Sequence, residues 1–143
     1  MNISFLNHEH YPDPTAYEAF KNIEMENKEA RDFRYLVYIC SPFSGNVDEN
    51  VKNARKYCRF AVDSGYIPIA THLFFPQFMN DDDKEERKLA MFFGNALMSK
   101  CSEIWVFGEN VSSGMASEIK RAKWKNYRIR YFDSNCREVR NNA

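Results

Sequence analysis

The sequence predicts an α/β fold: an open parallel sheet of four or five strands with helices on both faces. Short apolar runs recur along the chain, and YLVYIC at 35–40 is typical of a strand buried on both faces of a parallel sheet. Segments with apolar residues at helical spacing separate the runs, which indicates βαβ connections. Pro68 lies in the second run and cannot donate to a strand ladder, so we expect that strand at a sheet edge.

The expected strand order places a pocket. The strands are expected at 35–40, 66–71, 103–108 and 127–132. Right-handed crossovers, with the Pro68 strand at one edge, give an order of about 2-1-3-4. Ligands of such sheets bind at the switch point, here between the first and third strands, outside their carboxyl ends. The pocket is therefore expected to be lined by 41–46, 71–79 and 108–118.

The helices carry their own boundary signals. One is expected at 14–29 in the N-terminal part. Asn46, with Glu49 three residues later, caps the next helix, and Gly65 ends it. The following helix begins at the acidic run 81–83. We expect its apolar stripe to pack on the sheet; the stripe consists of Leu89, Phe93, Ala96, Leu97 and Cys101.

The 143 residues predict one main domain with two flanking segments. The domain is expected at 35–132, after an N-terminal extension, 1–34, that contains a helix, and before a polar tail, 133–143. The extension offers an apolar stripe for subunit contacts, made of Tyr17, Phe20 and Ile23.

Composition excludes several classes of function. Twenty Lys and Arg balance twenty Asp and Glu, and the two signs are interleaved, so no nucleic-acid polymer is expected as a partner. No apolar run reaches membrane-spanning length and residues 1–10 do not resemble a signal peptide, so we expect a cytoplasmic protein. The cysteines show no C-x-x-C spacing and predict neither a metal site nor a cofactor; they are Cys40, Cys58, Cys101 and Cys136.

The segment VSSGMASEIKRA, 111–122, is the most informative stretch. Ser112 or Ser113 caps a helix whose first free N–H groups, from Gly114 onward, face outward at the positive end of the helix dipole. Such a helix start binds phosphate. Glu118 lies one turn further on, where it would meet the sugar of a bound nucleotide. The alternative is a capped surface helix in which Glu118 pairs with Arg121 or with Lys123.

These motifs together resemble a known enzyme group. YICSPFSGN after the first strand, PIATHLFFPQF at the second, CSEIWVFG at the third and SSGMASEIKRA after it are similar to the nucleoside 2-deoxyribosyltransferase superfamily, over about Tyr35 to Phe132. The closest resemblance is to an uncharacterised bacterial and phage branch, related to the deoxynucleoside 5′-monophosphate N-glycosidases. The resemblance implies a flavodoxin-like, deoxyribosyltransferase-like fold.

The resemblance also implies roles for residues of the pocket. Glu118 matches the glutamate that attacks the anomeric carbon and forms a deoxyribosyl-enzyme ester as the base leaves. The end of the first strand and the loop after it match the part that contacts the ribose or base, through Tyr38, Cys40, Ser41, Ser44 and Gly45. The turn before Glu118 matches the 5′-phosphate site, made of Ser112, Ser113, Gly114 and Met115.

The sequence departs from the superfamily pattern at two positions. Active members carry an aspartate about two helical turns before the third strand, where this chain has Gly94. Relatives often carry a basic residue at the position of Ser44. His72 is a candidate for proton transfer because imidazole titrates near neutrality, although a hydrogen-bonded loop histidine is the alternative. Nearby aromatic residues are expected either to stack on a base or to pack in the core or an interface; they are Tyr66, Phe74, Phe75 and Phe78.

Two functional hypotheses follow, with a weaker third. The first is an N-glycosidase or 2-deoxyribosyltransferase that acts on a nucleoside or nucleotide through Glu118, with His72 as a second catalytic residue. The second is a nucleotide-binding module that senses or sequesters its ligand, for example an NAD-derived nucleotide, without turnover. The third is a structural domain that binds a partner through the N-terminal helix. The superfamily resemblance implies pockets completed across a subunit interface, and hence a homodimer or larger homo-oligomer.

Overall fold

The computed structural model describes residues 14–30 and 33–140, and the chain divides into two units, Met1–Phe33 and Arg34–Ala143. In the first unit, α1 spans Pro14–Ala30, close to the expected 14–29. Of its expected apolar stripe, Tyr17 and Ile23 are exposed and Phe20 is half-buried. Residues 1–10, which were assessed for a signal peptide, lie outside the described residues.

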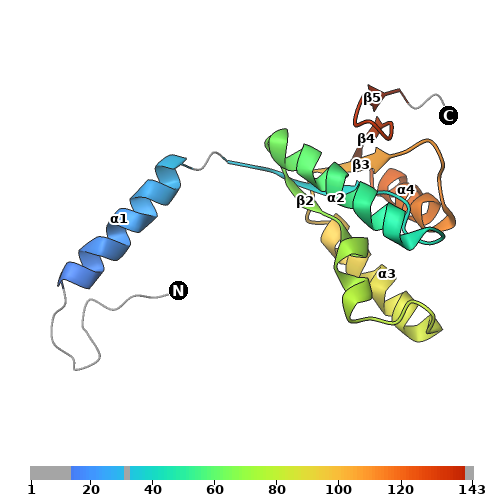
Figure 1. Cartoon of the computed structure of the whole chain (residues 1–143), viewed down its shortest axis with the longest axis horizontal. Coiled ribbons are helices and arrows are strands. Elements are labelled where there is room, and N and C mark those ends of the chain that lie inside the picture. The colour runs from blue at the N-terminus through green and yellow to red at the C-terminus, as the bar shows by residue number, and fades with distance from the viewer. Residues whose placement is uncertain (1–13, 31–32, 141–143) are drawn as a thin grey trace. The chain divides into compact units, whose positions relative to one another are not determined.

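A five-stranded sheet organises the second unit, in the order β2-β1-β3-β4-β5. Its strands are β1 (Leu36–Cys40), β2 (Ile67–Ile69), β3 (Glu103–Phe107), β4 (Arg128–Phe132) and β5 (Glu138–Val139). The first four are parallel, and β5 pairs antiparallel with β4 (Figure 1). The predicted fold class and strand order are confirmed. Pro68 pairs with Val37 on the edge strand, as its missing N–H requires.

Helices cover both faces of the sheet, each over its own apolar core. On one face, α2 (Val47–Asp63) packs through Tyr57 and Ala61 on side chains that include Trp105 and Phe107. On the other face, α3 (Lys84–Met98) and α4 (Ser113–Trp124) contribute Met98, Met115 and Ala122 to a second core. The face covered by α3 and α4 is the one that carries the candidate site.

The expected caps are present. Asn46 Oδ1 accepts a hydrogen bond from the backbone N–H of Glu49 at 3.3 Å, at the start of α2. Gly65 follows that helix with φ +90°, a conformation that residues with a Cβ rarely adopt. Asp83 caps α3 by accepting from the N–H groups of Glu85 and Glu86 at 2.9 and 3.4 Å. Both helices therefore begin with their first N–H groups satisfied by a side chain.

The predicted packing face of α3 is confirmed only towards its C-terminal end, where Leu97 is half-buried and Cys101, just after the helix, packs against the core. Leu89 is 46 % exposed, Phe93 is 36 % exposed and Ala96 is exposed, whereas Gly94 and Met98 are the buried residues of the helix. The run AMFFGNALM is apolar on most of its circumference, so periodicity alone does not select the buried side. Gly94 lies on the buried side, where an added Cβ would come within 3.3 Å of the Tyr38 hydroxyl on the sheet.

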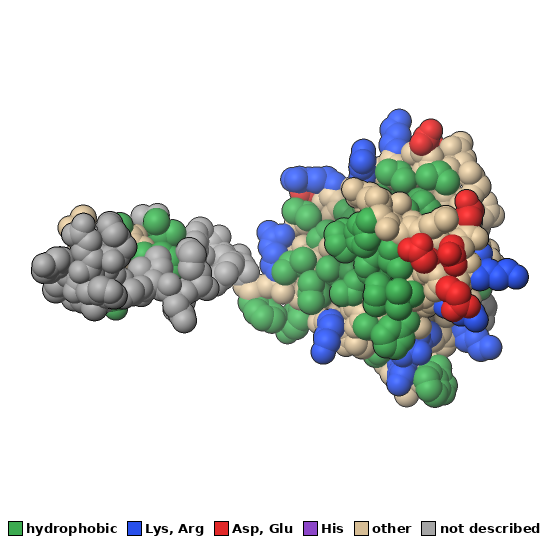
Figure 2. All heavy atoms as spheres, turned by 90° about the horizontal axis from the view of Figure 1, so that it is seen from below, with side chains coloured by type: hydrophobic (Ala, Val, Ile, Leu, Met, Phe, Trp, Pro, Cys, Tyr) green, Lys and Arg blue, Asp and Glu red, His purple; other side chains and the backbone are tan. Residues whose placement is uncertain are grey.

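The rotation of α3 leaves apolar side chains on the surface. They come from the helix and from the segment before it, which contains two short 3₁₀ helices, η1 (Thr71–Leu73) and η2 (Phe75–Gln77). The exposed residues are Phe74, Phe78, Leu89, Met91 and Phe92. Figure 2 views this unit from the side on which α3 lies in Figure 1, and it shows an apolar patch on that face.

The C-terminal segment contributes β5 to the sheet. Arg130 on β4 donates hydrogen bonds to Glu138 at 3.0 and 2.8 Å and to the buried Glu103 at 3.3 Å. The guanidinium also lies 5.0 Å from the centroid of the Trp105 ring. These contacts hold the short strand against β4, so residues 138–139 form part of the sheet within the segment expected as a polar tail.

The orientation of α3 predicts a contrast between two substitutions. Met98→Ala should lower the free energy of unfolding by about 2–5 kcal/mol, because it opens a cavity in the core. Leu89→Ala, the matched control on the exposed side, should cost less than about 1 kcal/mol. Urea denaturation of both variants checks this, and equal costs would contradict the observed orientation.

Candidate functional site

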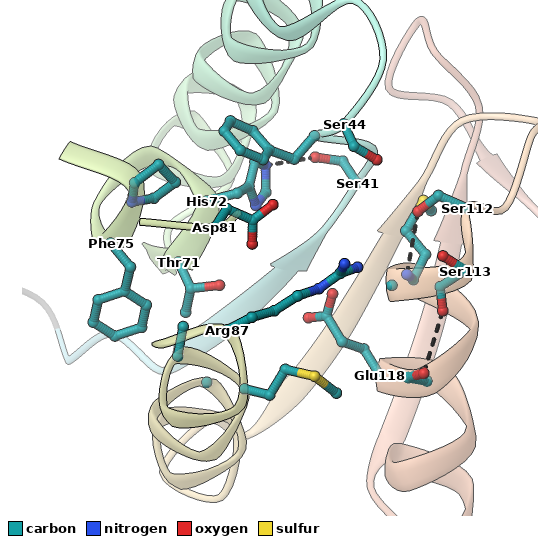
Figure 3. A pocket seen from close by; sticks show the side chains of 18 of the residues that line it. Ser41, Ser44, Thr71, His72, Phe75, Asp81, Arg87, Ser112, Ser113 and Glu118 are labelled. Atoms are coloured by element: carbon teal, nitrogen blue, oxygen red, sulfur yellow. Dashed lines mark hydrogen bonds between the residues drawn. The ribbon is translucent and has the colours of Figure 1, made fainter. Parts of the chain in front are cut away.

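A cavity of about 360 Å³ opens at the carboxyl ends of β1 and β3, on the face covered by α3 and α4. Its lining comes from the end of β1, the η1–η2 segment, α3 and α4 (Figure 3). The cavity lies near the predicted switch point, but residues 45–46 and 108–111 of the expected lining do not line it. Of the sequence-predicted site residues, those that line the cavity are Tyr38, Ser41, Ser44, His72, Ser112, Ser113, Gly114, Met115 and Glu118.

Glu118 extends from α4 into this cavity (Figure 3). Burial raises the pKa of its carboxyl to about 7, and a hydrogen bond with Tyr38 opposes part of that rise. No ion pair joins Glu118 to Arg121 or Lys123 within the described part of the chain. The expected alternative of a surface ion pair is therefore not what the structure contains, and Glu118 is a half-buried carboxyl with a pKa near neutrality.

Tyr38 connects Glu118 to the edge of the sheet. Its hydroxyl hydrogen-bonds Thr71 Oγ1 at 3.2 Å, and burial, followed by the charge of Glu118, raises the pKa of the phenol well above its ordinary value. A Cβ built at Gly94 would lie 3.3 Å from this hydroxyl. A side chain at position 94 would therefore require the Tyr38 hydroxyl to shift by a few tenths of an ångström.

The start of α4 forms the expected cap at the opposite wall. Ser112 is the N-cap residue, and its hydroxyl accepts a hydrogen bond from the N–H of Met115 at 3.2 Å. That N–H is therefore already satisfied, and the Met115 side chain is buried in the core. A Cβ at Gly114 would meet no atom within 4 Å, so a ligand can approach the backbone there.

His72 lies on the η1 side of the cavity. Its Nε2 and Ser41 Oγ form a hydrogen bond of 2.9 Å, and its ring lies 6.1 Å from that of Phe43. Burial lowers the pKa of the imidazole to about 4, so the ring is uncharged at neutral pH. His72 therefore lacks the near-neutral pKa on which its predicted role in proton transfer depends.

Some predicted residues do not reach the cavity. Cys40 is buried beneath it, and its Sγ lies 4.0 Å from the carbonyl oxygen of Met115. Gly45 lies outside the lining as well. Among the predicted aromatic residues, Phe75 lines the cavity, whereas Tyr66 packs against Trp105 in the core of the other face. Phe74 and Phe78 surround Phe75 and belong to the exposed apolar patch; they are 57 % and 61 % exposed.

The sequence prediction missed the polar groups that the turn before α3, α3 itself and the later part of α4 bring to the cavity. They are Asp81, Arg87, Asn95 and Arg121. Figure 3 shows the Arg87 side chain reaching across the cavity toward Glu118. Arg121 Nε is buried with no hydrogen-bond partner among the described residues. The signal that was available is spacing, since Arg87 follows the Asp83 cap by one turn and Arg121 follows Glu118 by one turn.

Neither a metal site nor a membrane span occurs in the described residues. Within 14–30 and 33–140, no three His, Cys, Asp or Glu side chains gather as metal ligands would. Over the same part of the chain, no helix has the length and apolarity needed to cross a membrane.

Comparison with known proteins places the domain in a family. Residues 35–132 match the family described as "Domain of unknown function (DUF7768)". The chain belongs to this family. No curated protein matches the DUF7768 chain.

The fold of this DUF7768 protein is similar to a solved structure of 2-deoxyribosyltransferase from the psychrotolerant bacterium Bacillus psychrosaccharolyticus. The TM-score is 0.60 and the identity is 18 %, over 74 % of this chain and 77 % of the other. The likeness shows a deoxyribosyltransferase-like fold.

The burial of Glu118 predicts a pH-dependent stability. Between pH 4.5 and about 7 the folded protein keeps a proton on Glu118 that the unfolded chain releases, so the free energy of unfolding falls as pH rises. Glutamine does not ionise, so Glu118→Gln should not lose stability as pH rises. The variant should be more stable than native protein by about 1–3 kcal/mol at pH 8, with little difference at pH 4. Thermal and urea unfolding at both pH values measure the difference, which an exposed Glu118 would not produce.

Proposed function

We propose that this DUF7768 protein binds a nucleoside or nucleotide and cleaves or transfers at its N-glycosidic bond, with Glu118 as the nucleophile. The observation that carries the proposal is the half-buried Glu118 carboxyl, which lines the cavity together with Tyr38 and has a pKa raised by burial to about 7. The deoxyribosyltransferase-like fold supports it. Glycoside-cleaving enzymes of the retaining type require such a carboxylate beside the anomeric carbon.

In the proposed reaction, ionised Glu118 attacks C1′ of the sugar. The C1′–O bond to Glu118 forms as the C1′–N bond to the base breaks, and the base leaves with the electron pair of that bond. Water then hydrolyses the glycosyl ester, or the nitrogen of a second base takes the sugar. Because the pKa of Glu118 is about 7, the rate is expected to rise with pH through neutrality.

The proposed assignment gives the two sides of the cavity different roles. His72, uncharged and hydrogen-bonded to Ser41, would hydrogen-bond the leaving base from the η1 side. Ser112, Ser113 and the backbone after Gly114 would hold a 5′-phosphate, at the positive end of α4. The reaction needs no cofactor, and a nucleic-acid polymer is not part of the proposal.

Gly94 favours a second candidate function. Tyr38 occupies the space next to Gly94, where an acid would be needed to match active superfamily members. A module that binds a nucleotide without turnover fits this feature. In either case we propose a cytoplasmic homo-oligomer, with the exposed apolar face of α3 as a contact surface.

Base release separates the two candidates. Native protein incubated with deoxynucleoside monophosphates should release free base, detected by chromatography, and a 2-fluoro-arabinosyl analogue should leave an adduct on Glu118. Glu118→Gln should bind the nucleotides and release no base, because glutamine cannot form the ester. Binding without release by native protein would favour the binding module, and undiminished release by Glu118→Gln would exclude Glu118 as nucleophile.

The phosphate site predicts a preference that can be removed. Native protein should bind a 5′-monophosphate more tightly than the bare nucleoside by about 1–3 kcal/mol, the range of hydrogen bonds to charged groups. Ser112→Ala with Ser113→Ala should abolish the preference while leaving nucleoside affinity unchanged. Ser99→Ala is the matched control, because Ser99 is an exposed serine outside the cavity lining. Calorimetry measures the affinities, and equal binding of nucleoside and monophosphate by native protein would contradict the assignment.

A further inference from the structure

The side of the cavity opposite the start of α4 carries a carboxylate that the proposed reaction does not use. Asp81 lines the cavity, and Figure 3 shows it beside His72 and across from Ser112 and Ser113. If the phosphate lies at the start of α4 and the sugar at Glu118, this side is where the base of the ligand lies.

The turn that carries Asp81 is held by its neighbours. The Asn80 side chain accepts from the N–H of Asp82 at 3.0 Å, and Glu86 accepts from the N–H of Asn80 at 3.3 Å. Asp81 itself makes no ion pair or side-chain hydrogen bond with another described residue. The Asp81 carboxylate therefore makes none of the hydrogen bonds that hold the turn, and it is available to a ligand.

The walls around Asp81 suit a flat ring. Phe43 and His72 lie 6.1 Å apart with their rings tilted by 50°, and Phe75 and Pro76 complete the apolar lining on this side. Aromatic and apolar walls of this kind bind a heteroaromatic base by stacking. They do not distinguish one base from another, so selectivity depends on the polar groups at the edge of the ring.

We propose that Asp81 is a specificity-determining residue that selects a guanine base; the inference rests on the proposed nucleotide-binding function. An ionised carboxylate only accepts hydrogen bonds, and it accepts two through its pair of oxygens. Guanine presents two adjacent donors, N1–H and the 2-amino group, which match Oδ1 and Oδ2. Hypoxanthine lacks the amino group, and adenine and cytosine offer only one donor group at the corresponding edge.

The test compares ligands that differ at this edge. Affinities of dGMP, dIMP and the xanthine nucleotide dXMP are measured by calorimetry with the full chain, in the Glu118→Gln background so that no ligand is consumed. The affinity for dGMP should be at least about tenfold higher than that for dIMP, because hypoxanthine makes one fewer hydrogen bond to the charged carboxylate. Adding Asp81→Asn should remove that ratio and raise the affinity for xanthine, because an amide donates to the 2-oxo group while accepting from N1–H.

Asp82→Asn is the matched control, since Asp82 is adjacent and exposed but lies outside the cavity lining. It should leave the guanine preference unchanged. A misfolded Asp81→Asn variant cannot gain xanthine affinity, so this gain separates altered recognition from lost structure. Nucleotide binding without guanine preference, or with a preference that Asp81→Asn does not change, would overturn the role of Asp81 and leave the proposed function standing. Absence of binding to any nucleotide would overturn both.

Discussion

The parallel pairing of β1 with β3 is the constraint on which the site depends. Its register places Tyr38 opposite Ile104 and Cys40 opposite Val106, so the two strands end together. Alternation along each strand sends Val37 and Ile39 to the core under α2, and Tyr38 and Cys40 to the core under α3 and α4. A slip of one residue would reverse these faces and remove Tyr38 from Glu118. The chemistry of the cavity is therefore fixed by hydrogen bonds between two backbones.

Burial has opposite effects on the pKa values of two titratable side chains in the cavity lining, Glu118 and His72. The same loss of water raises the pKa of Glu118 and lowers that of His72, because it disfavours the charged form of each. Near pH 7 the imidazole is therefore uncharged, and the Glu118 carboxyl, with a pKa of about 7, is about half ionised. The proposed reaction requires Glu118 to lose its proton there, while His72 offers hydrogen bonds without a charge.

The sequence predicted the architecture because local signals and topology rules agree in this chain. Continuous apolar runs identified four strands, Pro68 identified the edge, and right-handed crossovers left little freedom in their order. The segment around Ser112 gave the cap of α4 in the same way. The rotation of α3 was not predictable from a helix that is apolar on most sides. Asp81 and Arg87 were missed for a related reason, since an exposed charge at a helix start becomes a cavity residue only once that rotation is known.

The two ends of the sheet limit how this domain can aggregate or assemble. An open strand edge invites pairing with another chain, and both outer strands here are poor templates for it. β2 is three residues long and contains a proline, and β5 is two residues long and tied to β4 by Arg130 and Glu138. Growth of the sheet from molecule to molecule is thereby blocked at both ends. Association of this domain is therefore expected through its helical surfaces, at the exposed apolar side of α3.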